Sequence, residues 1–219
     1  TNLALNFGAF ATPGIYTVIA TTTSSTCTKT MTGSAVINVN PLPLPYTVYG
    51  GGSFCAGSTG VHVQLSGSNT GIQYQLYKGT LAVGSPRAGT GGMLDFGAYT
   101  ATGTYTVMAM NPSTFCELVM LGSALIQENP LPNVYTVTGG GTYCTGGAGS
   151  SVGLSFSNSG VNYQLMKDGV AIGAPTSGLD APLDFGMQTA SGVYTVVATN
   201  AITGCVNNMA GSVTVTINP

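Results

Sequence analysis

Residues 183–200, LDFGMQTASGVYTVVATN, show the strand pattern that decides the fold. The first part places Leu183 and Phe185 on one face, and the second part places Tyr194, Val196 and Ala198 on one face. Alternation with a period of two residues is typical of half-buried β-strands. The stretch therefore predicts two consecutive strands of an all-β protein.

The same stretch occurs twice more, at a constant step of 89 residues, as LDFGAYTATGTYTVMAMN at 94–111 and LNFGAFATPGIYTVIATT at 5–22. Internal repeats of this kind indicate an array of similar units. The Asn-Pro pairs that begin at 40, 129 and 218 keep the step, with no insertion or deletion. We therefore expect two full domains, 42–130 and 131–219, after the C-terminal part of a preceding repeat at 1–41. A domain that begins part-way suggests a segment of a longer array.

Along 131–219, short alternating segments are separated by Gly, Pro and Asp-Gly turn signals, and no sustained helical period is present. The pattern predicts about seven short strands and a Greek-key β-sandwich. The residues expected to face the core are Val152, Leu154, Phe156, Val161, Tyr163, Leu165, Leu183, Phe185, Tyr194, Val196, Ala198, Val213, Val215 and Ile217.

Charge is scarce in this chain. Only 5% of the residues are charged, against about 25% in typical domains. Four Lys and Arg residues cannot form a basic patch, so nucleic acid is a poor partner. No apolar run is long enough to predict a membrane span. Because a neutral surface resists association weakly, the composition suits a protein that is covered by copies of itself or tethered outside a cell.

The five cysteines allow two pairing schemes. Cys55–Cys116 and Cys144–Cys205 are each 61 residues apart and would close each repeat as a unit, with Cys27 pairing upstream of residue 1. The other scheme joins neighbouring repeats as Cys27–Cys55 and Cys116–Cys144, each 28 residues apart. We expect the first scheme, while free buried thiols are the alternative to both. Disulfides would indicate an oxidising, extracellular setting.

No recurring residues predict catalysis or metal binding. His62 is replaced by Ser151 in the next repeat, and Asp95 and Asp184 are replaced by Asn6 in the first copy. A catalytic acid would not tolerate that change, so a role in a turn or at a strand end is expected. The glycine triplets at 50–52 and 139–141 are not followed by the Lys-Ser/Thr of a phosphate loop. We predict no enzyme activity, no cofactor and no metal.

The segments YQLMKDG, LDFG and SGVYTV resemble the C, E and F strands of an immunoglobulin-like domain. The Gly-x-Tyr that begins the third segment resembles a tyrosine corner, which this resemblance assigns to Tyr16, Tyr105 and Tyr194. Two features depart from antibody domains: no tryptophan stands on the C strand, and the cysteines lie outside strands B and F. The resemblance implies a variant immunoglobulin-like sandwich.

Each whole repeat is similar to the immunoglobulin-like repeats of giant surface proteins of Bacteroidota. The similarity includes the opening NPLP, the YTVTGGG–YC segment, LDFG, the YTV–ATN segment and the closing NP. It implies a secreted stalk, filament or adhesin exported by the type IX pathway, whose partners are further copies of the repeat in cis and in a homo-assembly. Such a segment would supply length and mechanical rigidity. A module that binds glycans or surfaces through its loops is the alternative.

The opening of each repeat combines stiff and flexible residues. Prolines favour extended backbone and narrow the angles that a linker explores, so we expect a stiff join between sandwiches. The glycine triplet then allows a tight bend that brings the next cysteine to the sandwich wall. The residues expected to form the join are Pro41, Pro43, Pro45, Pro130 and Pro132.

Overall fold

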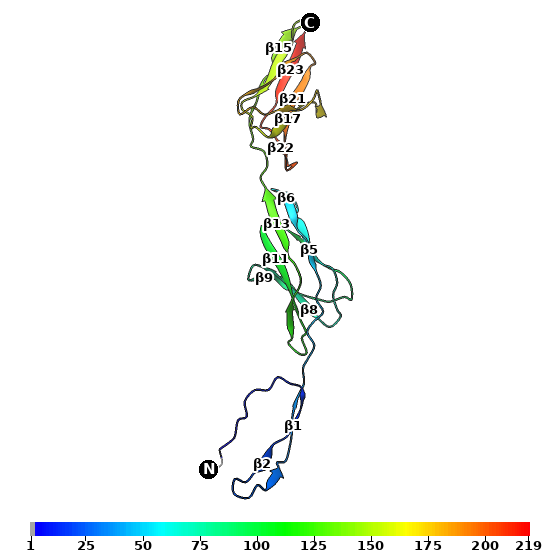
Figure 1. Cartoon of the computed structure of the whole chain (residues 1–219). Coiled ribbons are helices and arrows are strands. Elements are labelled where there is room, and N and C mark those ends of the chain that lie inside the picture. The colour runs from blue at the N-terminus through cyan, green and yellow to red at the C-terminus, as the bar shows by residue number, and fades with distance from the viewer. Residues whose placement is uncertain (1–2) are drawn as a thin grey trace. The chain divides into compact units, whose positions relative to one another are not determined.

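The computed structural model describes residues 3–219 and consists of β-strands and loops in this range (Figure 1). The described chain divides into two compact units. The first contains the residues up to Val48 together with Leu65–Leu94 and Thr106–Ser123, and the second contains Tyr49–Gln64, Asp95–Tyr105 and Ala124–Pro219. The division runs through residues 42–130, so the expected domain boundaries after residues 41 and 130 remain predictions.

Residues 131–219 form two facing sheets. One has the order β14-β16-β20, and the other has the order β15-β23-β21-β17-β18, with β19 beside β17 and β22 beside β21. The strands are β14 (Val137–Gly139), β15 (Gly141–Cys144), β16 (Ser150–Leu154), β17 (Val161–Lys167), β18 (Val170–Ala171), β19 (Thr176–Ser177), β20 (Leu183–Gln188), β21 (Gly192–Asn200), β22 (Val206–Asn208) and β23 (Val213–Asn218).

This strand order is that of an immunoglobulin-like Greek-key sandwich. The chain passes between the sheets from β16 to β17 and again from β20 to β21, while β15 runs parallel to β23 at the edge of the second sheet. The predicted all-β immunoglobulin-like fold class is therefore confirmed. More strands occur than the seven expected, because the first strand is split in two, the edge beside β17 is broken, and β22 follows the loop after β21.

The core between the sheets contains most of the residues that the alternation predicted. Tyr163 and Tyr194 are among the largest fully buried side chains of the described chain. Ile217 is an exception, since it lies near the end of β23 and is 39% exposed. The core cluster consists of Val137, Val152, Leu154, Val161, Tyr163, Leu165, Leu183, Tyr194, Val196, Ala198, Met209 and Val215, with Tyr135, Tyr143, Ile172, Phe185 and Val213 packed against it.

Residues 42–130 repeat the arrangement with the sheet orders β10-β7-β5 and β6-β13-β11-β8-β9, and β12 lies beside β11. The strands are β5 (Val48–Gly50), β6 (Gly52–Cys55), β7 (Val61–Leu65), β8 (Gln73–Lys78), β9 (Leu81–Ala88), β10 (Leu94–Tyr99), β11 (Gly103–Met110), β12 (Glu117–Val119) and β13 (Ala124–Asn129). Residues 3–41 form two strand pairs, β1 (Gly14–Tyr16) with β4 (Ala35–Ile37) and β2 (Ile19–Thr21) with β3 (Thr28–Thr30).

The glycine triplet 139–141 carries the chain from one sheet to the other. Gly139 ends β14 in the first sheet, and Gly141 begins β15 in the second. All three glycines have positive φ angles, of 89°, 72° and 127°, a region that glycine adopts without steric cost. A Cβ atom on Gly139 would collide with the Ser151 carbonyl oxygen, and one on Gly140 would lie 2.8 Å from the Val213 Cβ atom. Glycine is therefore required at the crossover.

Candidate functional site: the join between repeats

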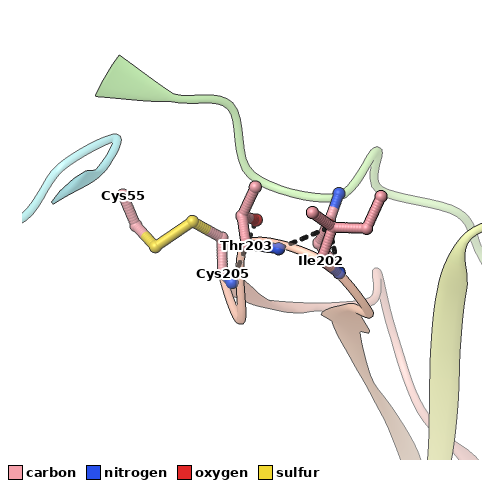
Figure 2. Close-up of a disulfide and its surroundings, with 5 residues drawn as sticks. Cys55, Ile202, Thr203 and Cys205 are labelled. Atoms are coloured by element: carbon pink, nitrogen blue, oxygen red, sulfur yellow. Dashed lines mark hydrogen bonds between the residues drawn. A yellow bond between two sulfur atoms is a disulfide. The ribbon is translucent and has the colours of Figure 1, made fainter. Parts of the chain in front are cut away.

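A disulfide joins Cys55, from the repeat 42–130, to Cys205, from the repeat 131–219 (Figure 2). The two Cα atoms lie 5.5 Å apart, within the range that disulfides adopt. The bond closes a loop with a sequence separation of 150 residues. In the chain-entropy model, a loop of this length stabilises the folded state by about 5 kcal/mol.

A tight turn between β21 and β22 holds Cys205. The Asn200 amide donates to the Cys205 carbonyl oxygen at 2.9 Å, and the Asn200 Oδ1 atom accepts from the amides of Ile202 and Thr203, each at 3.0 Å. The Cys205 amide in turn donates to Thr203 Oγ1 at 3.4 Å. These bonds satisfy the turn internally and fix the direction of the cysteine side chain, which is fully buried.

The end of strand β6 positions Cys55. Strand β6 runs parallel to β13, and Cys55 lies opposite Asn129. The next amide, that of Ala56, donates to the Asn129 carbonyl oxygen at 3.0 Å. Because Pro130 follows Asn129 directly, Cys55 is held next to the point where one repeat passes into the next.

The disulfide corrects the predicted pairing within each repeat, and it also differs from the alternative scheme. The structure joins Cys55 to Cys205 in place of Cys55–Cys116 and Cys144–Cys205, and equally in place of Cys27–Cys55 and Cys116–Cys144. Within the described residues, the free cysteines are Cys27, Cys116 and Cys144.

The sheet register explains why one repeat cannot close its own bond. Cys144 lies opposite Asn218 of β23. The start of β21, Gly192, pairs with Val215 of the same strand, so Cys144 lies beyond the start of β21. Cys205 instead follows Asn200, at the far end of β21. Strands rise by about 3.4 Å per residue, so the two cysteines are separated by about 35 Å along the sheet. A disulfide requires Cα atoms less than about 7 Å apart.

The prolines of the join differ in burial. Pro43 and Pro132 are buried, whereas Pro41, Pro45 and Pro130 are exposed. The Pro132 carbonyl oxygen accepts a hydrogen bond at 2.8 Å from the side-chain nitrogen Nδ2 of Asn207. Asn207 lies two residues after the bonded Cys205. Pro132 is therefore packed into the base of its own repeat, and only part of the proline segment can act as a linker.

The three tyrosines assigned to tyrosine corners make the same hydrogen bond. Each hydroxyl donates to the carbonyl oxygen four residues upstream: Tyr16 to Thr12 at 2.9 Å, Tyr105 to Ala101 at 2.8 Å, and Tyr194 to Ala190 at 2.7 Å. Burial raises the pKa of Tyr105 and of Tyr194 above the ordinary tyrosine value. The neutral hydroxyl therefore remains a donor to the loop that precedes the strand.

The acidic residue of LDFG serves a turn. Asp95 Oδ1 accepts from the Gly97 amide at 2.8 Å, and Asp184 Oδ1 accepts from the Gly186 amide at the same distance. In the first copy, Asn6 Oδ1 accepts from the Gly8 amide, also at 2.8 Å. An amide oxygen replaces a carboxylate oxygen without loss of this bond. The expectation of a turn role is thus borne out.

His62 and Asp95 form an exposed hydrogen-bonded pair. His62 Nδ1 lies 2.8 Å from Asp95 Oδ2, and Gln64 Nε2 donates to the same oxygen at 3.3 Å. The hydrogen bond with His62 is the largest cause that lowers the pKa of Asp95. In the next repeat, the Ser151 hydroxyl donates to Asp184 at 2.9 Å in the equivalent place. The pair lies on the outer surface of neighbouring strands and joins them side chain to side chain.

An open apolar hollow lies on residues 5–37. Its lining includes Leu5, Phe7, Tyr16, Val18 and Ile37. The residues 89 positions later are all buried in the core of the next repeat, and they are Leu94, Phe96, Tyr105, Val107 and Ile126. The composition of the hollow is therefore that of a sandwich core and does not indicate a ligand site.

Within residues 3–219, no three His, Cys, Asp or Glu side chains come together as a metal site would need. In the same residues, no helix is long and apolar enough to cross a membrane.

No family model matches the sequence, and no curated protein matches it. Solved structures are similar at low identity. A mouse coronavirus receptor-binding domain complexed with its murine receptor matches with 13% identity over 79% of this chain and all of that chain, at a TM-score of 0.41. Fibronectin(III)-like modules of Clostridium thermocellum CbhA match with 14% identity over 78% of this chain and 94% of theirs, at 0.39.

Sidekick-1 immunoglobulin domains 1–5 match with 17% identity and a TM-score of 0.39, over 94% of this chain and 46% of that chain. All three scores lie below 0.5, so the fold assignment depends on the strand order described above.

Proposed function

We propose that this chain is a structural segment of an extracellular filament or adhesin stalk, in which immunoglobulin-like repeats supply length and mechanical rigidity. The observation that carries the proposal is the disulfide between Cys55 and Cys205, which links one repeat covalently to the next. A bond in this place limits the movement of one repeat against the next. Residues 1–41, 42–130 and 131–219 are the units of this proposal.

The setting of the proposed stalk is the outside of a cell. Structural disulfides form and persist in oxidising compartments, which supports secretion or display at a surface. The Bacteroidota origin and the type IX pathway implied by the resemblance belong to this proposal. Its partners are further copies of the repeat in cis and parallel chains in a homo-assembly.

The role is not enzymatic and needs no cofactor. The polar side chains that could suggest catalysis hold turns and neighbouring strands together, as Asp95, Asp184 and Asn6 show. In the described part of the chain, every buried side-chain nitrogen and oxygen atom has a hydrogen-bond partner.

Electron microscopy of the intact protein taken from its native cell surface tests the proposal. We expect fibres with a beaded repeat of one sandwich length, about 30–40 Å for strands of roughly ten residues. Short compact particles would contradict the filament and stalk function. Fibres that lose their beading after mild reduction would additionally support the role of the disulfides.

A binding module is the second candidate, because the edge of the larger sheet, beside β8 in one repeat and β17 in the next, differs between the repeats. Strand β9 is continuous over eight residues in one repeat, whereas the next has only the two-residue strands β18 and β19. The most divergent segments are 85–93 and 174–182. A glycan array with the chain tests this function, and exchanging the two segments should change the bound set. No binding above background in either form would exclude glycan recognition by these loops.

A further inference from the structure

The free Cys144 occupies the same local environment as the bonded Cys55. Each residue ends a strand that runs parallel to the last strand of its repeat, with Cys55 opposite Asn129 and Cys144 opposite Asn218. The amide after Cys144, that of Thr145, donates to the Asn218 carbonyl oxygen at 2.8 Å, which matches the bond after Cys55. The strand end that presents the thiol is thus built twice, although only one copy is bonded.

The free Cys116 likewise lies in a turn equivalent to the one that holds the bonded Cys205. The Asn111 amide donates to the Cys116 carbonyl oxygen at 2.9 Å, as Asn200 does to Cys205. The Cys116 amide donates to Thr114 Oγ1 at 3.4 Å, the distance found between Cys205 and Thr203. A third turn is present at Cys27, whose carbonyl oxygen accepts from the Thr22 amide at 3.0 Å.

The surroundings of Cys116 also point to the position of a missing partner. Its Sγ atom lies 3.9 Å from the Asn40 carbonyl oxygen. Asn40 precedes Asn129 by one repeat, and Asn129 is the residue opposite the bonded Cys55. Suppose that a strand end pairs with Asn40 in the way that the strand end at Cys55 pairs with Asn129. Its cysteine would then lie next to Cys116.

We propose that Cys144 and Cys116 are each one half of the same inter-repeat disulfide, completed in cis by an adjacent copy of the repeat. Cys144 forms a disulfide with the turn cysteine, equivalent to Cys205, of a copy that follows. Cys116 forms a disulfide with the strand-end cysteine, equivalent to Cys55, of a copy that precedes. Cys27 is a further turn thiol of the same kind. In each bond two thiols lose two protons and two electrons to a disulfide oxidant such as oxidised glutathione, which leaves as two thiols.

The inference deepens the proposed structural function and rests on it for the presence of adjacent copies. It also assigns every cysteine of the chain to one rule: the strand-end thiol of one repeat bonds the turn thiol of the next. The sequence separation of 150 residues between Cys55 and Cys205 then applies along the whole array.

The test uses the full chain extended after Pro219 by one more copy of residues 131–219. In the added copy Val206→Ile marks the peptide that contains the second turn thiol, and Thr145→Ser marks the peptide that contains the second strand-end thiol. Both masses therefore differ from those of the original Cys205 and Cys144 peptides. The protein is folded with a reduced and oxidised glutathione mixture, free thiols are alkylated, and peptic peptides are mapped without reduction. We expect Cys55 bonded to the original Cys205, and Cys144 bonded to the marked turn cysteine.

Two variants of the extended chain serve as controls. Cys144→Ser should leave the marked turn cysteine alkylated and the Cys55–Cys205 bond unchanged, adding one free thiol to the parent count. Cys116→Ser should leave both bonds unchanged and remove one free thiol.

Three results would overturn the inference. They are an alkylated Cys144, a bond from Cys144 to Cys116 or to the Cys205 of its own repeat, and a ladder of linked chains on a non-reducing gel, which would place the partner in trans. The mapping does not depend on filament formation, so its failure is distinguishable from the absence of fibres on the native surface.

Discussion

At the scale of single residues, the side chains that break the apolar pattern are those that hold the loops. Ser157 is fully buried, and its hydroxyl donates to the Ala181 carbonyl oxygen at 2.7 Å and accepts from the Leu179 amide at 3.1 Å. Ser68 makes the equivalent bond to the Gly92 carbonyl oxygen at 2.6 Å. Because buried hydroxyls without partners are costly, these serines specify one loop conformation.

The turn at LDFG gives a prediction about charge. Asp184→Asn keeps the acceptor for the Gly186 amide, so its midpoint of thermal unfolding should stay close to that of the parent. Asp184→Ala removes the acceptor and should cost about 1–2 kcal/mol. Circular dichroism melting curves of both variants check this. An Asn variant as unstable as the Ala variant would show that the carboxylate charge matters beyond the turn.

The lowered pKa values predict acid sensitivity. His62 lowers the pKa of Asp95, and the Val193 amide, followed by Lys167, lowers that of Asp168. An aspartate whose pKa is lower in the folded state stabilises the fold above its unfolded value, and this stabilisation is lost as the pH falls through the folded value. The melting midpoint should therefore decrease as the pH falls below about 4.

Asp95→Asn should make this decrease smaller. His62→Ser, which copies the residue of the next repeat, should have part of the same effect, because it removes the largest cause of the shift. Melting curves between pH 2 and pH 5 measure both variants. An Asn variant with the pH dependence of the parent would contradict the assignment.

At the scale of elements, the split first strand is the device that completes both sheets. Strand β14 pairs with β16 in one sheet, and after Gly140 the chain continues as β15, which pairs with β23 in the other sheet. The crossover covers the edge of the second sheet and also delivers Cys144 to the end of the repeat. One backbone feature therefore serves both the closure of the sandwich and the position of a thiol.

A pair of glycine substitutions isolates the steric part of this crossover. A Cβ atom on Gly140 would lie 2.8 Å from the Val213 Cβ atom, whereas one on Gly146 would meet nothing within 4 Å. Their φ angles are similar, at 72° and 80°. Gly146→Ala should cost about 1 kcal/mol from backbone strain alone, and Gly140→Ala should cost clearly more. Equal melting midpoints for the two variants would show that the sheet edge can move aside.

Most of each element could be predicted from alternation, because a half-buried strand must place its apolar residues on one face. Tyr163, Leu165, Tyr194 and Val196 are buried as the pattern requires. Ile217 obeys the same alternation but is exposed, since the pattern does not show where the covering sheet ends. The edge strands were the least predictable, because Val170 and its neighbours face little that constrains them.

At the scale of the whole molecule, the disulfide pairing shows what spacing alone leaves out. Equal spacings of 61 residues made a bond within each repeat attractive. The signal against it was nevertheless present in the order of the elements, since Cys144 follows the first strand and Cys205 follows the long strand β21. In an immunoglobulin-like order these two positions lie at opposite ends of the sandwich. The disulfide pairing therefore has to be deduced from the order of the strands and not from equal spacings between the cysteines.

The same bond decides how the chain responds to a stretching force. A pull applied at the two ends passes from Cys55 to Cys205 through the sulfur atoms, so the residues between them carry no tension even if they unfold. At about 3.5 Å per extended residue, the oxidised chain should have a contour length about 500 Å shorter than the reduced chain. Single-molecule stretching with and without a reductant measures this difference, and equal lengths would contradict it. The Cys55–Cys205 bond thus keeps a segment of 150 residues from lengthening the chain under force.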